Sequence, residues 1–117
     1  MTSFLSRRIQ HDFLESCEGI QNGALRVVTP EGDVHDFGQG MPQAELLIHD
    51  WAAITAAAAR GDIGFGEAYV AGLWDTPSIE AVTTVALNNL GALQGYAYPS
   101  VLANLKFRVV DRIMRAN

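Results

Sequence analysis

Apolar residues recur at helical spacing near the start of the chain, and polar residues fill the positions between them. One face of a helix would carry Phe4, Leu5, Ile9, Phe13 and Leu14. Thr2 and Ser3 just before them are residue types that commonly cap a helix. We therefore predict a first helix that runs to about residue 16.

The pattern changes after residue 23 to short apolar stretches with turn residues between them. These stretches lie at 25–28, 34–37 and 44–48, and Pro30 and Gly32 stand where a hairpin loop favours them. Adjacent strands with short connections predict an antiparallel meander. The third strand is apolar on both faces at 46–48, so it is expected in the interior of the sheet.

Helical spacing returns in the second half of the chain. Asp50 is expected to cap an alanine-rich helix over residues 51–60, which Gly61 would end. A short helix is expected over residues 67–73. Asp75 or Thr76 would cap a further helix that reaches residue 91.

A last helix is expected from Ser100, with basic residues on one face. The elements together predict one α+β domain over residues 1–117. In it a small antiparallel sheet of about three strands or more packs against four to five helices.

The stretch GDIGFGEAYVAGLWD at residues 61–75 combines glycines with aromatic residues and carboxylates. We interpret it as a tight, aromatic-filled connector between two helices, in which Gly64 and Gly66 turn the chain. A phosphate-binding glycine loop would follow a parallel strand, whereas these glycines follow a helix. A cofactor loop is therefore not predicted.

Two carboxylates of this stretch, Glu67 and Asp75, flank its aromatic residues. In an apolar pocket their pKa values would be raised, and they could then act in acid–base chemistry. Alternatively, Asp75 caps a helix and Glu67 accepts hydrogen bonds from loop backbone.

Four aromatic residues are candidates for an apolar ligand pocket: Trp51, Phe65, Tyr69 and Trp74. Aromatic residues in a small domain commonly form its core. The two interpretations do not exclude each other, because a sheet covered by loosely packed helices can part to admit an acyl chain.

The net charge of −5 is unevenly distributed along the chain. Between residues 19 and 105, nine acidic residues face two basic ones, Arg26 and Arg60. Nucleic-acid binding is therefore disfavoured. Four basic residues follow near the C-terminal end and could contact an anionic membrane surface or form a solvated face: Lys106, Arg108, Arg112 and Arg115.

Cysteine and histidine usage gives little sign of special chemistry. Cys17 is the single cysteine, so no internal disulfide is possible, and we interpret it as a small buried apolar residue. His11, His35 and His49 lack zinc-ligand spacing, so no metal site is predicted. No apolar run is long enough to span a bilayer and no secretory signal is evident, so a cytoplasmic location is expected.

The residues at 61–69 and 72–75 resemble a motif in the N-terminal domain of cyclopropane-fatty-acyl-phospholipid synthases, which are S-adenosylmethionine-dependent methyltransferases. The preceding segments GALRVV, PEGDVHDFG and AELLIHD support the resemblance, which covers roughly residues 23–89 within a family-like core at 19–91. Its structural motif residues are Gly61, Gly64, Gly66, Glu67, Gly72 and Asp75. The chain departs from the family at Val70, Ala71 and Leu73, where the family has Met, Asp and Trp.

The resemblance implies a sterol-carrier-like lipid-binding topology and a role in engaging phospholipid. It implies that S-adenosylmethionine and the catalytic residues belong to a separate methyltransferase domain, so neither a cofactor nor a catalytic residue is expected here. Residues 100–117 would be a basic helix or a linker toward that domain.

The leading hypothesis is an accessory lipid-engaging domain that presents phospholipid acyl chains to a catalytic domain, in cis or in trans. It would work at the inner face of the membrane, and a homodimer is possible. One alternative is a non-enzymatic carrier that holds an acyl chain inside the domain. Another is a docking or dimerisation module for a catalytic subunit.

Overall fold

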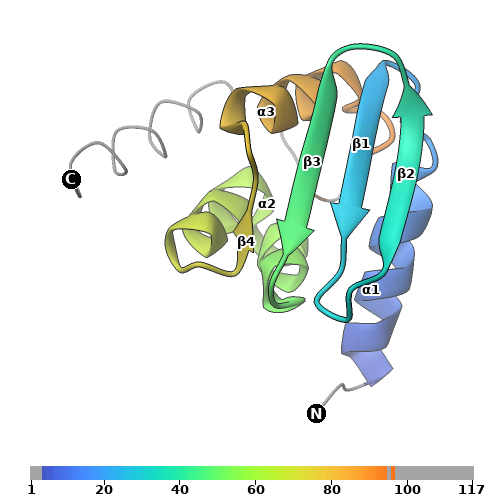
Figure 1. Cartoon of the computed structure of the whole chain (residues 1–117). Coiled ribbons are helices and arrows are strands. Elements are labelled where there is room, and N and C mark those ends of the chain that lie inside the picture. The colour runs from blue at the N-terminus through green and yellow to red at the C-terminus, as the bar shows by residue number, and fades with distance from the viewer. Residues whose placement is uncertain (1–3, 95, 97–117) are drawn as a thin grey trace, which may run out of the picture.

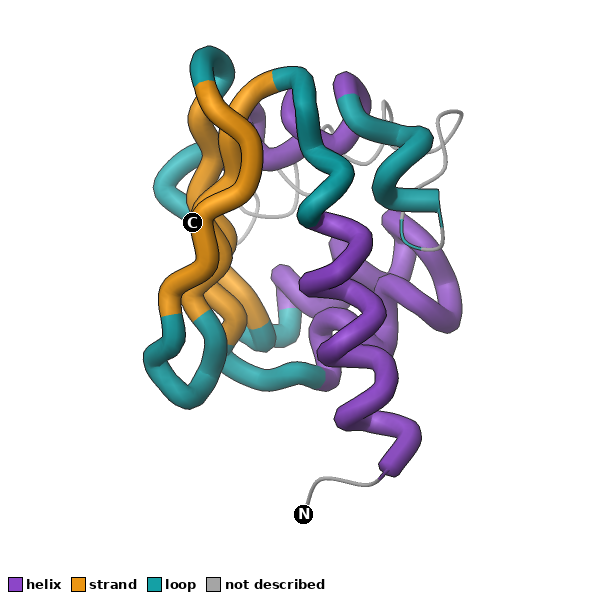
Figure 2. Tube along the Cα trace, turned by 90° about the vertical axis from the view of Figure 1, so that its right-hand side faces the viewer, coloured by secondary structure: helices purple, strands orange, loops and turns teal. Residues whose placement is uncertain are grey.

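The computed structural model describes residues 4–94 and 96, and in these residues three helices cover one face of a four-stranded sheet (Figures 1 and 2). The helices are α1 (Phe4–Cys17), α2 (Ala52–Val70) and α3 (Ile79–Asn88). The strands are β1 (Gly23–Val28), β2 (Val34–Gln39), β3 (Gln43–Ile48) and β4 (Trp74–Asp75). The α+β class is confirmed, although this region holds three helices rather than four to five. The helix predicted from Ser100 lies outside the described residues.

The strand order is β2-β1-β3-β4, and the sheet is mixed. β1 pairs with β2 antiparallel and with β3 parallel, and β3 pairs with β4 antiparallel. The predicted antiparallel meander is therefore wrong, because β3 lies beside β1 instead of β2. The interior position predicted for β3 is confirmed.

The crossing from β2 to β3 depends on a close approach at Gly23, the first residue of β1. Gly23 has φ of 101°, and a Cβ added to it would lie 2.7 Å from the carbonyl oxygen of Pro42. That same oxygen accepts a hydrogen bond from the N–H of Ala24 at 2.9 Å. A residue without a side chain thus lets the link pass over the end of β1.

Helix α2 is kinked at Gly61, which has φ of 64° and ψ of −145°. The kink separates an alanine-rich arm (52–60) from a glycine-rich arm (62–70), so the predicted helix end at Gly61 is confirmed. The predicted turn at Gly64 and Gly66 is wrong, because both residues are helical and buried. A Cβ at Gly64 would overlap the carbonyl oxygen of Ala56, so glycine lets the two arms pack closely.

The second arm of α2 ends in a Schellman motif around Gly72, which has φ of 82°. The N–H of Leu73 donates to the carbonyl of Ala68 at 2.9 Å, and that of Gly72 donates to Tyr69 at 3.0 Å. The helix predicted over 67–73 is thus the C-terminal part of α2. These bonds turn the chain sharply into β4.

The cap of α3 is Ser78, whose hydroxyl accepts the N–H of Ala81 at 3.1 Å. The prediction of Asp75 or Thr76 as the cap is therefore wrong. Asp75 belongs to β4 opposite Leu47, and its carboxylate accepts the N–H of Thr76 at 2.8 Å.

Candidate functional site

An apolar cavity of about 80 Å³ lies between the sheet and the helices. All three helices and the strands β1, β3 and β4 contribute to its wall, which includes Leu25, Leu46, Phe65, Trp74, Val82 and Val85. For comparison, an engineered cavity of about 150 Å³ in another protein binds benzene. The space present here suits a group of only a few carbon atoms.

Asp62 also lines this cavity, and its carboxylate oxygens are buried. Asp62 is 1% exposed, and neither of its carboxylate oxygens has a hydrogen-bond partner within the part of the chain that the structure describes. Burial raises the pKa of Asp62. The nearby backbone N–H groups of Asp62 and Ile63 offset part of that rise, although neither forms a hydrogen bond of good geometry with the carboxylate. A buried carboxyl without a partner costs free energy in the folded state, so its presence in an apolar wall requires an explanation.

The kink at Gly61 explains how Asp62 enters the interior. Asp62 is the first residue of the second arm of α2, and helical spacing sets it on the same face as Phe65 and Gly66. Both of those residues line the cavity too. The local sequence therefore puts one carboxyl among the apolar residues that the arm turns toward the sheet.

The two carboxylates predicted for an apolar pocket are elsewhere. Glu67 is exposed and forms an ion pair with Arg60 at 2.6 Å across the kink, and Asp75 is exposed in β4. The pocket hypothesis for Glu67 and Asp75 is therefore wrong. Asp62 was missed because residues 61–66 were interpreted as a turn, whereas a helical interpretation would have placed it beside Phe65.

Three of the four predicted aromatic residues form one cluster. The rings of Phe65 and Trp74 are stacked with centroids 4.2 Å apart, and Tyr69 packs on Trp74 at 4.8 Å. The indole N–H of Trp74 donates to the carbonyl of Phe65 at 2.8 Å, and Trp74 is 4% exposed. The cluster is thus part of the hydrophobic core.

Trp51 lies apart from that cluster, at the start of α2. It is half-buried, and its indole N–H donates to the carboxylate of Glu31 at 3.2 Å. It borders an open surface groove together with Glu31 and His49. A lipid role for any of the four aromatic residues stays a prediction, and so does the membrane contact of Lys106, Arg108, Arg112 and Arg115, which lie outside the described residues.

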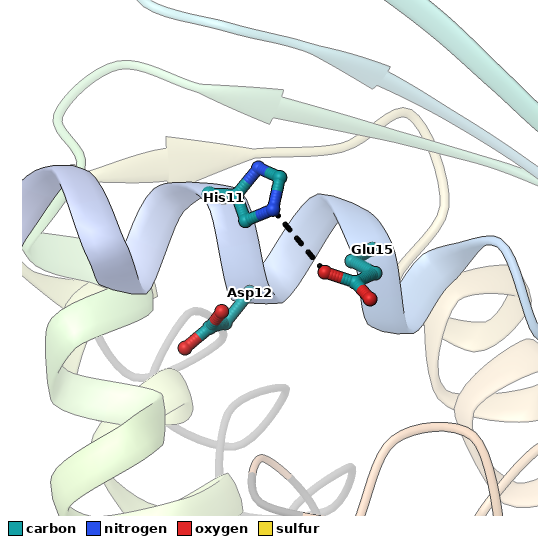
Figure 3. Close-up of side chains that lie close together, drawn as sticks. All are labelled: His11, Asp12 and Glu15. Atoms are coloured by element: carbon teal, nitrogen blue, oxygen red, sulfur yellow. Dashed lines mark ion pairs between the residues drawn. The ribbon is translucent and has the colours of Figure 1, made fainter.

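Potential metal ligands meet on α1, where the ligand atoms of His11, Asp12 and Glu15 all lie within 4.8 Å of one another. Figure 3 shows the ion pair of His11 with Glu15, whose atoms are 3.2 Å apart. Asp12 is paired with Arg8 at 3.4 Å. Both are largely exposed i,i+4 pairs, which form on many helix surfaces and do not by themselves indicate a metal site. The four-residue spacing of His11 and Glu15 within a helical pattern is the signal in the sequence for this pair.

Cys17 is fully buried, and burial raises its pKa to about 12. A thiol with so high a pKa holds almost no thiolate at neutral pH and is a poor nucleophile. The interpretation of Cys17 as a buried apolar residue is confirmed.

Among the residues described, no helix is both long enough and apolar enough to cross a membrane. Comparisons with protein-family models, with curated proteins and with solved structures give no match. The resemblance to the cyclopropane-fatty-acyl-phospholipid synthases therefore rests on the motif at residues 61–75 and the segments that precede it in the sequence.

Proposed function

We propose that this chain is an accessory lipid-engaging domain of a cyclopropane-fatty-acid-synthase-like methyltransferase, acting at the cytoplasmic face of the membrane. The observation that carries the proposal is the glycine–aromatic motif at residues 61–75. A methyltransferase domain, in cis or in trans, would hold the S-adenosylmethionine and act on the acyl chains.

The motif residues have structural roles that are compatible with this proposal. Gly61 kinks α2, Gly64 allows its two arms to approach, and Gly72 ends it. Because Phe65 and Trp74 pack on each other beside the cavity, their rings are engaged within the domain. We therefore assign the membrane contact to the basic residues at 106–115 instead of the aromatic cluster.

Co-sedimentation with vesicles tests the membrane contact. The chain should sediment with vesicles that contain anionic phospholipid and remain in solution with neutral ones. Each basic residue near an anionic surface contributes about 1 kcal/mol, and this attraction is screened by salt. Raising the salt concentration should therefore release the protein.

A charge-neutralised variant localises the contact. Replacing Lys106, Arg108, Arg112 and Arg115 by Gln should abolish sedimentation. The matched control is Arg26→Gln, since Arg26 lies on the sheet and is exposed. Failure of the unmodified chain to bind anionic vesicles at low salt would contradict the proposal.

The acyl-carrier alternative is favoured by one observation, the apolar cavity. With about 80 Å³ of space, an acyl chain longer than a few carbons would require the helices to move apart. Native mass spectrometry of the purified chain tests this alternative. A bound lipid mass would favour the carrier, and its absence after expression in a lipid-containing cell would count against it.

A further inference from the structure

The cationic side chains of the described region do not supply a partner for Asp62. Arg8, Arg26 and Arg60 are paired with Asp12, Asp36 and Glu67, respectively, and the remaining arginine of this region, Arg7, is exposed on α1. None of these arginines lines the cavity. A counter-ion for the buried carboxyl would therefore come from outside this part of the chain.

We propose that the cavity is a binding site for a small alkylammonium group, with the Asp62 carboxylate as its counter-ion. The ammonium would donate hydrogen bonds to carboxylate oxygens that have no donor among residues 4–94 and 96. Aromatic rings in the wall, among them Phe13, Phe65 and Tyr96, also favour a cation through their π-electrons. An anion would be repelled by the same carboxylate.

The size of the cavity limits the ligand. Its volume of about 80 Å³ is roughly half that of a cavity that holds benzene, so it fits an ammonium group with about three or four carbons. The walls are apolar, so alkyl substituents lose no hydrogen bonds on binding. A decyl chain would not fit without repacking of α2 or α3.

The ammonium could be that of a free amine or that of an ethanolamine phospholipid headgroup. Asp62 is 1% exposed, and a headgroup that remains attached to a bilayer would have to bring its phosphate into an apolar wall. The structure therefore favours the free amine. This inference goes beyond the proposed function, because binding of a free amine requires no membrane.

Isothermal titration calorimetry of the full chain with butylammonium, butanol and butyrate tests the site. The three ligands have similar size and differ in their polar end. A charge-assisted hydrogen bond should make butylammonium bind at least about tenfold more tightly than butanol, and butyrate should not bind. Equal binding of butylammonium and butanol by the unmodified chain would overturn the proposal, as would no binding of butylammonium.

The variant Asp62→Asn tests the role of the carboxyl. It removes a buried charge that has no partner in the described part of the chain, so it should fold. It should lose the preference for butylammonium over butanol. Asp36→Asn is the matched control: its carboxyl is exposed on the sheet, and butylammonium binding should be unchanged. Tight butylammonium binding that survives in Asp62→Asn would place the ligand elsewhere and overturn the proposal.

A competition experiment with vesicles distinguishes the source of the ammonium group. Phosphatidylethanolamine vesicles should not displace butylammonium from the chain. Displacement of butylammonium from the unmodified protein would overturn the assignment to a free amine. Neither result depends on the anionic-vesicle experiment, so the two proposals can fail separately.

Discussion

Asp36 and Asp62 carry the same side chain in opposite surroundings. Asp36 lies on the open face of the sheet, where Arg26 donates a hydrogen bond to its carboxylate at 2.8 Å. That hydrogen bond and the arginine charge hold the pKa of Asp36 below its usual value. Asp62 lies among apolar side chains, with no hydrogen-bond partner in the region that the structure describes, and burial raises its pKa.

The comparison shows which kind of carboxyl indicates a site. An exposed pair such as Arg26 and Asp36 is well hydrated whether or not it forms, so it contributes little to stability. A buried carboxyl without a partner lowers the stability of the folded state, and stability alone would not favour it. A functional role therefore explains the buried carboxyl of Asp62 more directly than a contribution to stability does.

The interior and the open face should differ most in their response to loss of a large side chain. Trp74→Ala removes a ring that packs on Phe65 and Tyr69, and it should cost about 3–5 kcal/mol in the free energy of unfolding. Val34→Ala on β2 is the control, because Val34 is 54% exposed, and it should cost far less. Urea denaturation measures both, and a cost below about 1 kcal/mol for Trp74→Ala would refute its place in the core.

The close contact that positions Asp62 should be nearly as sensitive. Gly64→Val would push a side chain into the backbone of Ala56, and the resulting overpacking should cost about 1–3 kcal/mol. Gly91→Ala is the control, since nothing lies within 4 Å of a Cβ added there. If thermal denaturation gave the same midpoint for both variants, the two arms of α2 would not be in contact at Gly64.

Ionisation of Asp62 should make the free energy of unfolding depend on pH. Its folded-state pKa lies above the ordinary value of 3.8, so the folded state binds more protons than the unfolded state between those two pKa values. The stability that protonated Asp62 contributes at low pH is therefore lost as pH rises from the unfolded-state pKa through the folded-state pKa. Asp62→Asn should be more stable than the unmodified chain at neutral pH and should lack this fall. A parallel pH profile for the two proteins would contradict the buried state of the carboxyl.

The smallest effect is expected on the open face. Arg26→Gln should leave the midpoint of thermal unfolding within experimental scatter at physiological salt, because the pair with Asp36 is exposed and screened. A shift comparable to that of Gly64→Val would mean that surface charge, and not the interior, dominates the stability of this domain.

The helices and strands could be predicted from the sequence where periodicity was clear. The spacing in α1 and the turn residues Pro30 and Gly32 predicted elements that the structure contains. The strand order could not be predicted, because periodicity does not reveal which neighbour a strand pairs with. Gly23 was the local signal for the crossing, and its meaning depends on a contact with Pro42 that is remote in sequence.

The candidate site was harder to predict than the fold. Glycines suggested a turn at residues 61–66, but Gly64 serves close packing within a helix. A turn at these residues favoured Glu67 over Asp62 as the carboxylate of an apolar pocket, but the structure places Glu67 at the surface with Arg60. Periodicity that includes glycine positions would have set Asp62 on the apolar face.

The most direct test of the account is the carboxyl ¹³C NMR titration of Asp62 with and without butylammonium. In the free chain, Asp62 should titrate above its ordinary pKa, because burial disfavours the charged form. Saturating butylammonium should lower that pKa, because the cation binds the ionised carboxyl. An ordinary pKa that does not respond to butylammonium would contradict both the buried carboxyl and its role as a counter-ion.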